Sequence, residues 1–348
     1  MENHSTIVFL GNGYDVAYGY DTRYGDFYKD ELFEELCNKS NLLAKFIDNA
    51  NKEKGKNKEQ EKGGEQDDGS KWSDLEEELY NYSRDLTRKN KNGDPPNLKL
   101  GKSTNAMNLQ PEQKLSVSAK NFYEDFQQLQ DYLGRFILKK TDNSQPHHYN
   151  NYQDLKNLTN DWLDEDESAL VVSFNYTNVF WGTHTSANIL YVHGSIHELQ
   201  PKTRGSLEME PTGRCLNHNI VLGIDEAMEV ETAHSFLYKA YNEPTNIHHL
   251  STIFRNAKRY IIFGCSLGET DRWYFENIFN KEQADKTYEI YHYKATEQLN
   301  INSRIKDISK SSIADFKERN NVLYLDSSDI KKAIEKRREY YKRFPFNP

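Results

Sequence analysis

Short apolar runs, spaced tens of residues apart, constrain the fold of this chain more than any other feature. The runs are nearly continuous in apolar residues, a pattern typical of strands buried on both faces of a sheet. The intervening lengths suit helical crossovers between parallel strands. The runs lie at residues 7–10, 170–174, 189–192, 220–224, 260–263, 288–293 and 322–325. The sequence therefore predicts an α/β fold with a Rossmann-like, mostly parallel sheet.

The first two strands are separated by a long segment of a different texture. Apolar residues recur at helical spacing within residues 27–46, 72–86 and 122–136, and the last two of these helices are expected to pack together. Residues 51–71 and 89–113 are polar and offer few anchors for a core, so we expect mobile loops there. The sequence thus predicts one α/β domain over residues 1–348, with a helical insertion at about 30–165.

Composition restricts the class of protein. Fifty-four acidic residues against 45 basic ones give a net charge of −9, which argues against general binding to nucleic acid. No apolar run approaches the roughly 20 residues of a membrane span, and no basic segment precedes the first apolar run as in a secretory leader. The three cysteines are far apart and odd in number, as in a reducing compartment. We therefore expect a cytoplasmic protein without a membrane partner.

Polar or glycine turns follow four of the predicted strands. Because ligands of open parallel sheets bind beyond the carboxyl ends of the strands, these turns are the candidate site. They are Gly11-Asn12-Gly13-Tyr14-Asp15, Asn175-Tyr176-Thr177-Asn178, His193-Gly194-Ser195 and Gly264-Cys265-Ser266-Leu267-Gly268.

The first turn has features of a nucleotide-binding loop. Gly11 and Gly13 would let a ligand approach the backbone closely, but the third glycine of the dinucleotide fingerprint is missing. A tight strand-to-helix turn with Asp15 as the helix N-cap explains the pattern equally well. If a nucleotide binds, Asp15 suits a ribose hydroxyl or a water better than a pyrophosphate.

Asn175 and His193 are the candidate catalytic residues. The Asn175 amide can donate and accept hydrogen bonds and could hold a water or a sugar hydroxyl, although closing a turn is its ordinary role at this place. The His193 imidazole could act as a general base. The two residues are predicted to lie at the same edge of one sheet, and this convergence favours a catalytic role.

The turn at residues 264–268 matches the Gly-x-Ser-x-Gly nucleophile elbow of hydrolases. A hydrolase of that type needs an acid and then a histidine after the serine, and here only His292 follows, inside a predicted strand. Ser266 is therefore better explained as a donor to a ligand phosphate or hydroxyl, with Asp271 or Thr270 capping the next helix.

No complete metal site is visible in the sequence. Cys215 and His218 could form half of a zinc site, but no second cysteine pair exists. The adjacent histidine pairs at 147–148 and 248–249 lack the spacing that puts two ligands on one helix face. We expect no metal cofactor.

With these motifs in view, the chain resembles the AbiH family of bacterial abortive-infection, phage-resistance proteins. The resemblance spans most of the chain and implies a role in phage defence, in which the infected cell stops growing or dies. The segments that carry it are Gly11-Asn12-Gly13-Tyr14-Asp15, Tyr24-x-x-Phe27, Trp72-x-x-Leu75-Glu76, Phe174-Asn175-Tyr176-Thr177, His193-Gly194, Gly223-Ile224-Asp225 and Phe263-Gly264-Cys265-Ser266-Leu267-x-x-x-Asp271.

The order of these turns also looks distantly like the sirtuin-type fold, whose defence members hydrolyse NAD. That likeness implies NAD as the substrate, with Gly11, Asn12, Gly13, Asp15, Gly264, Ser266 and Asp271 as its binding residues. It also implies that Asn175 positions the water or ribose and that His193 is the base. Tyr14 and Asp15 stand where the sirtuin loop has small residues, and Thr177 stands where such hydrolases often carry Asp. The four-cysteine zinc module of the deacetylases is absent, which disfavours deacetylation.

The sequence thus favours a phage-defence effector that hydrolyses NAD or a related nucleotide. A resting cell must tolerate the protein, so we expect latent activity, released by a phage-derived trigger or by assembly of several copies. Two alternatives stay open: a serine hydrolase that uses Ser266, and a non-enzymatic sensor of a nucleotide or a phage protein.

Overall fold

The computed structural model describes residues 4–60, 74–91, 111–143, 152–177, 188–196, 220–224, 228–239, 250–268 and 271–346. The chain divides into two compact units. The first, here called the sheet unit, contains residues 1–22, 137–203 and 243–348. The second, the helical unit, contains residues 23–136 and 204–242.

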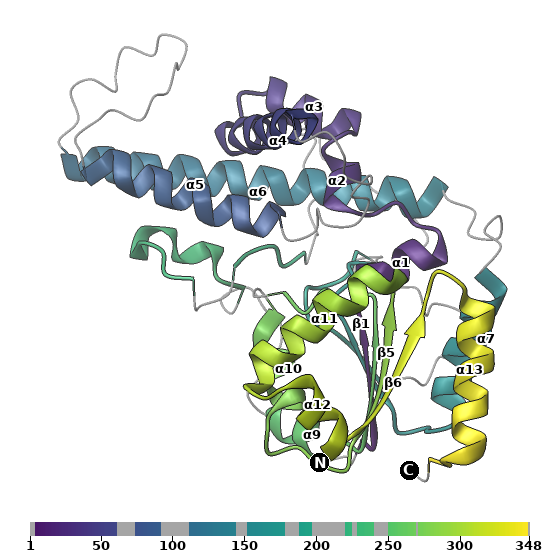
Figure 1. Ribbon diagram of the computed structural model, residues 1–348. Helices are drawn as coiled ribbons and strands as arrows, with labels where there is room; N and C mark the ends of the chain where they lie inside the picture. The colour runs from purple at the N-terminus through teal and green to yellow at the C-terminus, as the bar shows by residue number, and fades with distance from the viewer. Residues whose placement is uncertain are drawn as a thin grey trace. The chain divides into compact units, whose positions relative to one another are not determined.

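The sheet unit is built on six parallel strands. They are β1 (Thr6–Leu10), β2 (Leu170–Ser173), β3 (Asn188–Tyr191), β4 (Arg259–Phe263), β5 (Thr287–His292) and β6 (Asn321–Asp326). The order β3-β2-β1-β4-β5-β6 puts β1 in the centre, with Ile7 paired to Leu170 on one side and Tyr260 on the other (Figure 1). This order is that of the doubly wound dinucleotide-binding folds. The predicted α/β, Rossmann-like architecture is confirmed.

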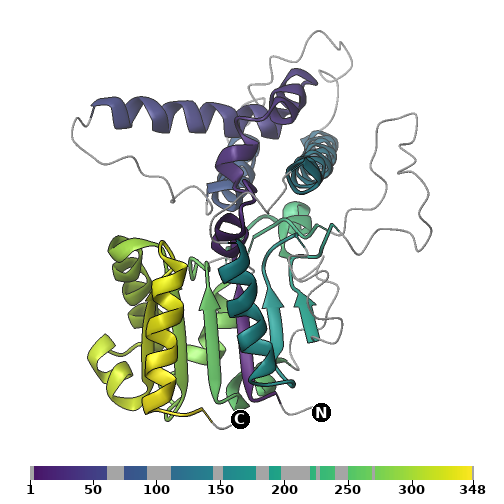
Figure 2. The ribbon, with the colours of Figure 1, turned by 90° about the vertical axis from the view of Figure 1, so that its right-hand side faces the viewer.

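Helices cover both faces of the sheet (Figure 2). One face carries α9 (Leu250–Asn256), α10 (Arg272–Phe279), α11 (Lys294–Ser309) and α12 (Ile313–Arg319), and the other carries α1 (Asn12–Tyr18), α7 (Tyr152–Asp164) and α13 (Ile330–Arg343). Within β1, Ile7 and Phe9 enter the first core, whereas Val8 and Leu10 enter the second. Because alternate strand residues face opposite sides, a strand covered on both sides needs the continuous apolar run seen in the sequence.

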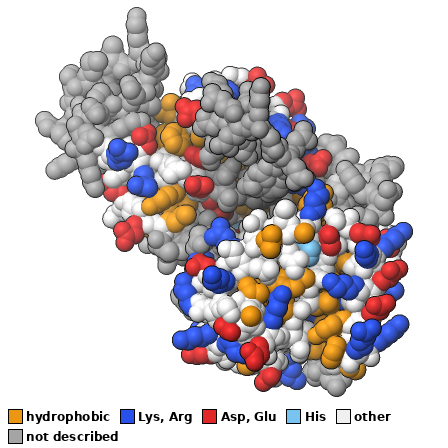
Figure 3. Space-filling model, in the orientation of Figure 1, with side chains coloured by type: hydrophobic (Ala, Val, Ile, Leu, Met, Phe, Trp, Pro, Cys, Tyr) orange, Lys and Arg blue, Asp and Glu red, His pale blue; other side chains and the backbone are white. Residues whose placement is uncertain are grey.

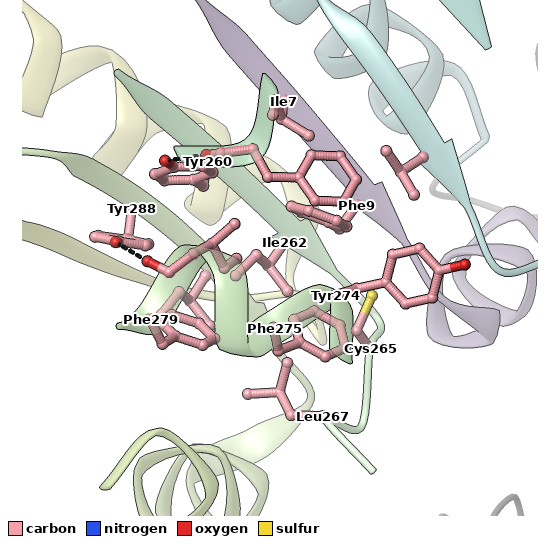
Figure 4. Close-up of a cluster of buried hydrophobic side chains, with 14 of the residues drawn as sticks. Ile7, Phe9, Tyr260, Ile262, Cys265, Leu267, Tyr274, Phe275, Phe279 and Tyr288 are labelled. Carbon is pink, nitrogen blue, oxygen red and sulfur yellow. Dashed lines mark hydrogen bonds between the residues drawn. The ribbon is translucent and has the colours of Figure 1, made fainter. Parts of the chain in front are cut away.

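Tightly packed aromatic rings form the core on the α10 side (Figure 4). Phe9 contacts Phe275 at a centroid distance of 5.6 Å, and Tyr260 stacks on Tyr288 at 5.0 Å. The two tyrosine hydroxyls donate to backbone carbonyls, Tyr260 to that of Phe254, so their burial leaves no polar atom unpaired. This core fixes where β1 and β4 end and therefore where their loops begin.

The helical unit contains α2 (Tyr24–Phe27), α3 (Glu31–Asn38), α4 (Leu42–Gln60), α5 (Asp74–Lys91), most of α6 (Pro111–Asn143) and a 3₁₀ helix, η3 (Thr232–Leu237). The predicted packing of α5 on α6 is confirmed, since the rings of Tyr82 and Phe122 lie 4.9 Å apart. At the start of α4, Asn41 caps the helix by accepting from the Ala44 amide, and the Asp125 carboxylate of α6 accepts from the Leu42 amide.

Two sequence predictions about secondary structure are wrong. Residues 220–224 form no strand of the sheet: they belong to the helical unit, where Ile224 makes a single bridge to Tyr238. Residues 51–60 are the last part of α4 rather than a loop, because a lysine- and glutamate-rich segment can stay helical without an apolar face. Residues 61–71 and 92–110 of the predicted loops lie outside the described residues.

The boundaries of the insertion also differ between the prediction and the division into units. The first segment of the helical unit ends at residue 136, whereas the predicted insertion extends to about residue 165. Helix α7 packs on the sheet through Leu155, Leu158 and Trp162, and residues 204–242 lie in the helical unit.

Charged groups of both signs are interspersed on the face of the molecule seen in Figure 3. In the part of the chain that the structure describes, no helix combines the length and the apolar character that crossing a membrane requires.

Candidate functional site

The candidate site lies at the carboxyl ends of the central strands. Strand β1 leads into α1 on one face of the sheet, and its neighbour β4 leads into α10 on the other, so the two connections diverge here. The Gly11 amide donates to the Phe263 carbonyl at 2.9 Å, and the Gly13 amide donates to the Gly264 carbonyl at 3.1 Å. This divergence is the topological switch point at which α/β sheets of this order bind ligands.

The three predicted site glycines are required by the packing of these two loops. A Cβ on Gly11 would lie 2.4 Å from the Gly264 oxygen, and one on Gly13 would lie 2.6 Å from the Gly264 Cα. Gly264 has a φ of +67° and faces the backbone of Tyr14. Loop-to-loop packing therefore accounts for all three glycines, and their contact with a nucleotide stays a prediction.

Asp15 is a buried member of α1, not its N-cap as the turn interpretation predicted. The N-cap is Gly11. Asp15 lies in the first turn of α1, and 1% of the residue is exposed. Its Oδ1 accepts from Asn175 Nδ2 at 2.9 Å, and its Oδ2 accepts from the hydroxyls of Thr177 at 2.7 Å and Thr22 at 3.5 Å. Burial raises the pKa of Asp15 to about 7, against the opposing effect of these hydrogen bonds.

Asn175 follows β2 and is hydrogen-bonded to the segment that follows β1. Its Nδ2 donates both to Asp15 Oδ1 and to the Gly11 carbonyl, the latter at 3.1 Å. Its Oδ1 is buried and has no hydrogen-bond partner among the residues that the structure describes. The same is true of the Oδ1 of Asn12, whose Nδ2 donates to Thr22 Oγ1 at 2.8 Å. The predicted residues Asn12, Asp15 and Asn175 thus form one hydrogen-bonded network.

His193 and Asp271 form a second group, although the sequence assigned them different roles. The His193 Nε2 lies 3.0 Å from Asp271 Oδ1, and the histidine is 5% exposed. The imidazole contacts the rings of Phe174 and Tyr176, the residues on either side of Asn175. Asp271 occupies the N-cap position of α10, but its side chain makes no capping hydrogen bond. A carboxylate placed in this way orients the imidazole.

Ser266 lacks the surroundings of a nucleophile. It is exposed, and within the described residues its hydroxyl makes no hydrogen bond to a histidine or carboxylate. The residues from Gly264 to Asp271 separate β4 from α10, so no sharp strand-to-helix elbow is formed. His292 lies in β5, as predicted, where its Nδ1 pairs with the Lys294 carbonyl.

Sequence reasoning missed two members of the network and one buried ion pair. Thr22 carried no signal, and Thr177 was considered as a turn residue and as a departure from the sirtuin pattern, but not as a partner of Asp15. In the helical unit, Lys239 and Glu76 form an ion pair at 2.8 Å with both side chains buried. Glu76 therefore has a structural explanation within that unit.

No metal centre emerges from the described part of the chain, in which no three His, Cys, Asp or Glu side chains are grouped to hold an ion. The residues weighed for metal binding, Cys215, His218 and the histidine pairs at 147–148 and 248–249, lie outside the described residues.

Comparison with protein families decides the relationship of the chain. A family model described as bacteriophage abortive infection AbiH matches residues 7–293. The chain belongs to the AbiH family. The match covers the loops after β1, β2, β3 and β4 that contain the network and the His193–Asp271 pair, and it assigns this AbiH protein a role in abortive infection. No curated protein and no solved structure matches the chain, so the likeness to sirtuins stays a prediction.

Proposed function

We propose that this AbiH protein acts in abortive infection by hydrolysing NAD or a related nucleotide in the cytoplasm of the infected cell. One observation carries the proposal: the structure groups Asn175 with Asp15 and His193 with Asp271 at the carboxyl ends of a sheet in the dinucleotide-binding order. Perturbed and paired polar groups at such a position favour catalysis over a purely structural role.

The chemistry required is hydrolysis of the bond between nicotinamide and ribose. The C–N bond breaks, neutral nicotinamide leaves with the bonding electrons, and a water oxygen bonds to the ribose carbon. Asn175 would hold the water or a ribose hydroxyl beside the cation-like transition state. His193, oriented by its 3.0 Å contact with Asp271, would act as the general base that takes the water proton.

A resting cell contains NAD, so the activity must be latent until infection. We propose that a phage-derived trigger or self-assembly of the chain completes the site. Constitutive loss of NAD in uninfected cells would contradict this part of the proposal.

The test is nucleotide consumption by the purified full chain, with and without lysate from phage-infected cells. Chromatography of NAD and its products should show cleavage by the wild type. His193→Ala should lower the rate by roughly 10²–10⁴-fold, the range of a lost general base. The matched control is His292→Ala. His292 is also a buried histidine at the end of a strand, but it lies outside this network.

Intact nucleotides in all conditions would contradict the proposed hydrolase. Binding of a nucleotide that depends on Asn175, without its cleavage, would favour the sensor alternative instead.

A further inference from the structure

The Asp15 carboxylate determines how the Asn175 amide is oriented. An ionised carboxylate only accepts hydrogen bonds, as does the Gly11 carbonyl, and both lie within 3.1 Å of the same atom of Asn175. That atom must therefore be the NH₂ group. The amide oxygen is turned to the opposite side, where it lies buried without a partner.

The same carboxylate fixes a second amide through a hydroxyl. The Thr22 hydroxyl donates to Asp15 Oδ2, so only its lone pairs are left to face Asn12. Asn12 accordingly presents its Nδ2 to Thr22 at 2.8 Å, and its oxygen is the second buried acceptor without a partner. Thr177 takes up the remaining capacity of Asp15 Oδ2 at 2.7 Å.

These two orphaned acceptors mark a place that calls for donors. A buried acceptor without a hydrogen bond costs about 1–3 kcal/mol, so a structure retains one chiefly where another molecule satisfies it. Asn175 is 2% exposed, whereas Gly13 in the loop after β1 and Ser266 in the loop after β4 are exposed. A phosphate or carboxylate offers only acceptors and would be repelled by Asp15.

We propose that Asp15 is a positioning residue that turns the amide oxygens of Asn12 and Asn175 toward a ribose, whose two hydroxyls donate to them. The inference rests on the proposed function in taking a nucleotide as the ligand. It adds that the sugar, rather than a phosphate, occupies the β1–β2 side of the site.

The test is binding, measured by calorimetry on the purified full chain at pH 8, above the pKa of about 7 to which burial raises Asp15, so that the carboxylate is ionised. The probes are adenosine and nicotinamide riboside, the 2′-deoxy counterpart of each, and inorganic pyrophosphate. Loss of one hydroxyl should weaken binding at least about tenfold, because it leaves a buried acceptor unpaired again. Pyrophosphate should not compete with the ribonucleosides.

Variants separate positioning from folding. In Asp15→Asn the new amide can donate as well as accept, so Asn175 is held by the Gly11 carbonyl alone and Thr22 is no longer obliged to donate, and the ribose-to-deoxyribose affinity ratio should fall. Asn12→Ala, at a half-buried position, should lower the same ratio even if Asn175→Ala fails to fold. Asn302→Ala, a half-buried asparagine whose partner is Tyr324, should leave the ratio unchanged.

Equal affinity for the ribose and deoxyribose forms, tighter binding of pyrophosphate, or no binding of either ribonucleoside would overturn the inference. Its failure can be told from that of the proposed hydrolase. NAD cleavage without discrimination between the sugars would remove only this inference. Ribose binding without cleavage of NAD would remove only the hydrolase.

Discussion

The sheet unit contains two buried carboxylates whose surroundings differ. Glu289 in β5 is fully buried, and its oxygens accept from Arg259 at 2.7 Å, from Arg337 at 2.8 Å and from the Tyr341 hydroxyl at 2.6 Å. Asp15 is equally buried, but its partners are the neutral side chains of Asn175, Thr177 and Thr22. One cluster ties α13 and β4 to β5, and the other lies at the strand ends.

The pKa values of the two carboxyl groups are shifted in opposite directions. Burial by itself raises the pKa of Glu289, but the guanidinium groups of Arg259 and Arg337 bring it below its ordinary value. No such cation faces Asp15 within the described network, and burial raises the pKa of Asp15 to about 7. A buried charge with counter-ions belongs to the framework, whereas one held by neutral groups costs stability and is best explained by function.

The largest effect on folding is expected at the Glu289 cluster. Glu289→Gln leaves two buried guanidinium groups with too little negative charge, and we expect the free energy of unfolding to fall by about 3–5 kcal/mol in denaturant titrations. Arg338→Ala removes a surface ion pair, in which Arg338 lies 3.5 Å from Asp161, and should lower the free energy of unfolding by at most about 1 kcal/mol. Equal effects of the two changes would remove the distinction.

Replacing the Asp15 carboxylate by an amide should change the free energy of unfolding in the opposite direction. Between about pH 4 and pH 7 the folded chain holds a proton that the unfolded chain has released, so this group's contribution to stability is lost as pH rises through that range. Asp15→Asn lacks this loss. We expect the variant to match the wild type near pH 4 and to be more stable by roughly 2–4 kcal/mol at pH 8, as measured by unfolding at both pH values.

Lower stability of Asp15→Asn than of the wild type at pH 8 would contradict the account of this carboxylate. The same variant should nevertheless lose sugar discrimination, because stability and function are opposed at this position.

A smaller loss is expected from Gly264→Ala. The new Cβ would meet the Tyr14 amide nitrogen at 2.4 Å, and the φ of +67° is strained for alanine, so we expect a loss of about 1–3 kcal/mol in thermal unfolding. Gly264→Asn tolerates the backbone angle but carries the same Cβ. If the asparagine variant recovers full stability, the close packing of the two loops is not what requires glycine here.

The smallest effect is predicted for Ser266→Ala. Its exposed hydroxyl makes no hydrogen bond within the described residues, so stability should change by no more than about 0.5 kcal/mol. Covalent labelling of Ser266 by a serine-directed probe would support the serine hydrolase, and absence of labelling would count against it.

Much of the sheet could be predicted because strands such as β1, β2 and β4 are buried along their whole length. Residues 7–10 contribute alternately to two cores, so four consecutive side chains must be apolar. Residues 220–224 are equally apolar and yet pair outside the sheet, since burial alone does not specify the partner of an apolar segment. The helical end of α4 was missed for the reverse reason: it has no apolar face to reveal it.

The site could be predicted as a set of strand ends but not as a network. Order along the chain located Asn175 and His193, because parallel strands end at one edge of a sheet. It did not reveal that Asp271 is the partner of His193 or that Thr22 belongs with Asp15. These contacts depend on side-chain directions in loops, which no periodicity encodes.

The most direct test of the account is the amount of NAD in cells during phage infection. Cells that carry the wild-type chain should be compared with cells that carry Asn175→Ala or His193→Ala at matched protein levels, with His292→Ala as the control. We predict that NAD collapses after infection with the wild type and with His292→Ala, and that it stays level with the other two variants. A constant NAD level in cells that the wild-type chain still protects would contradict the account.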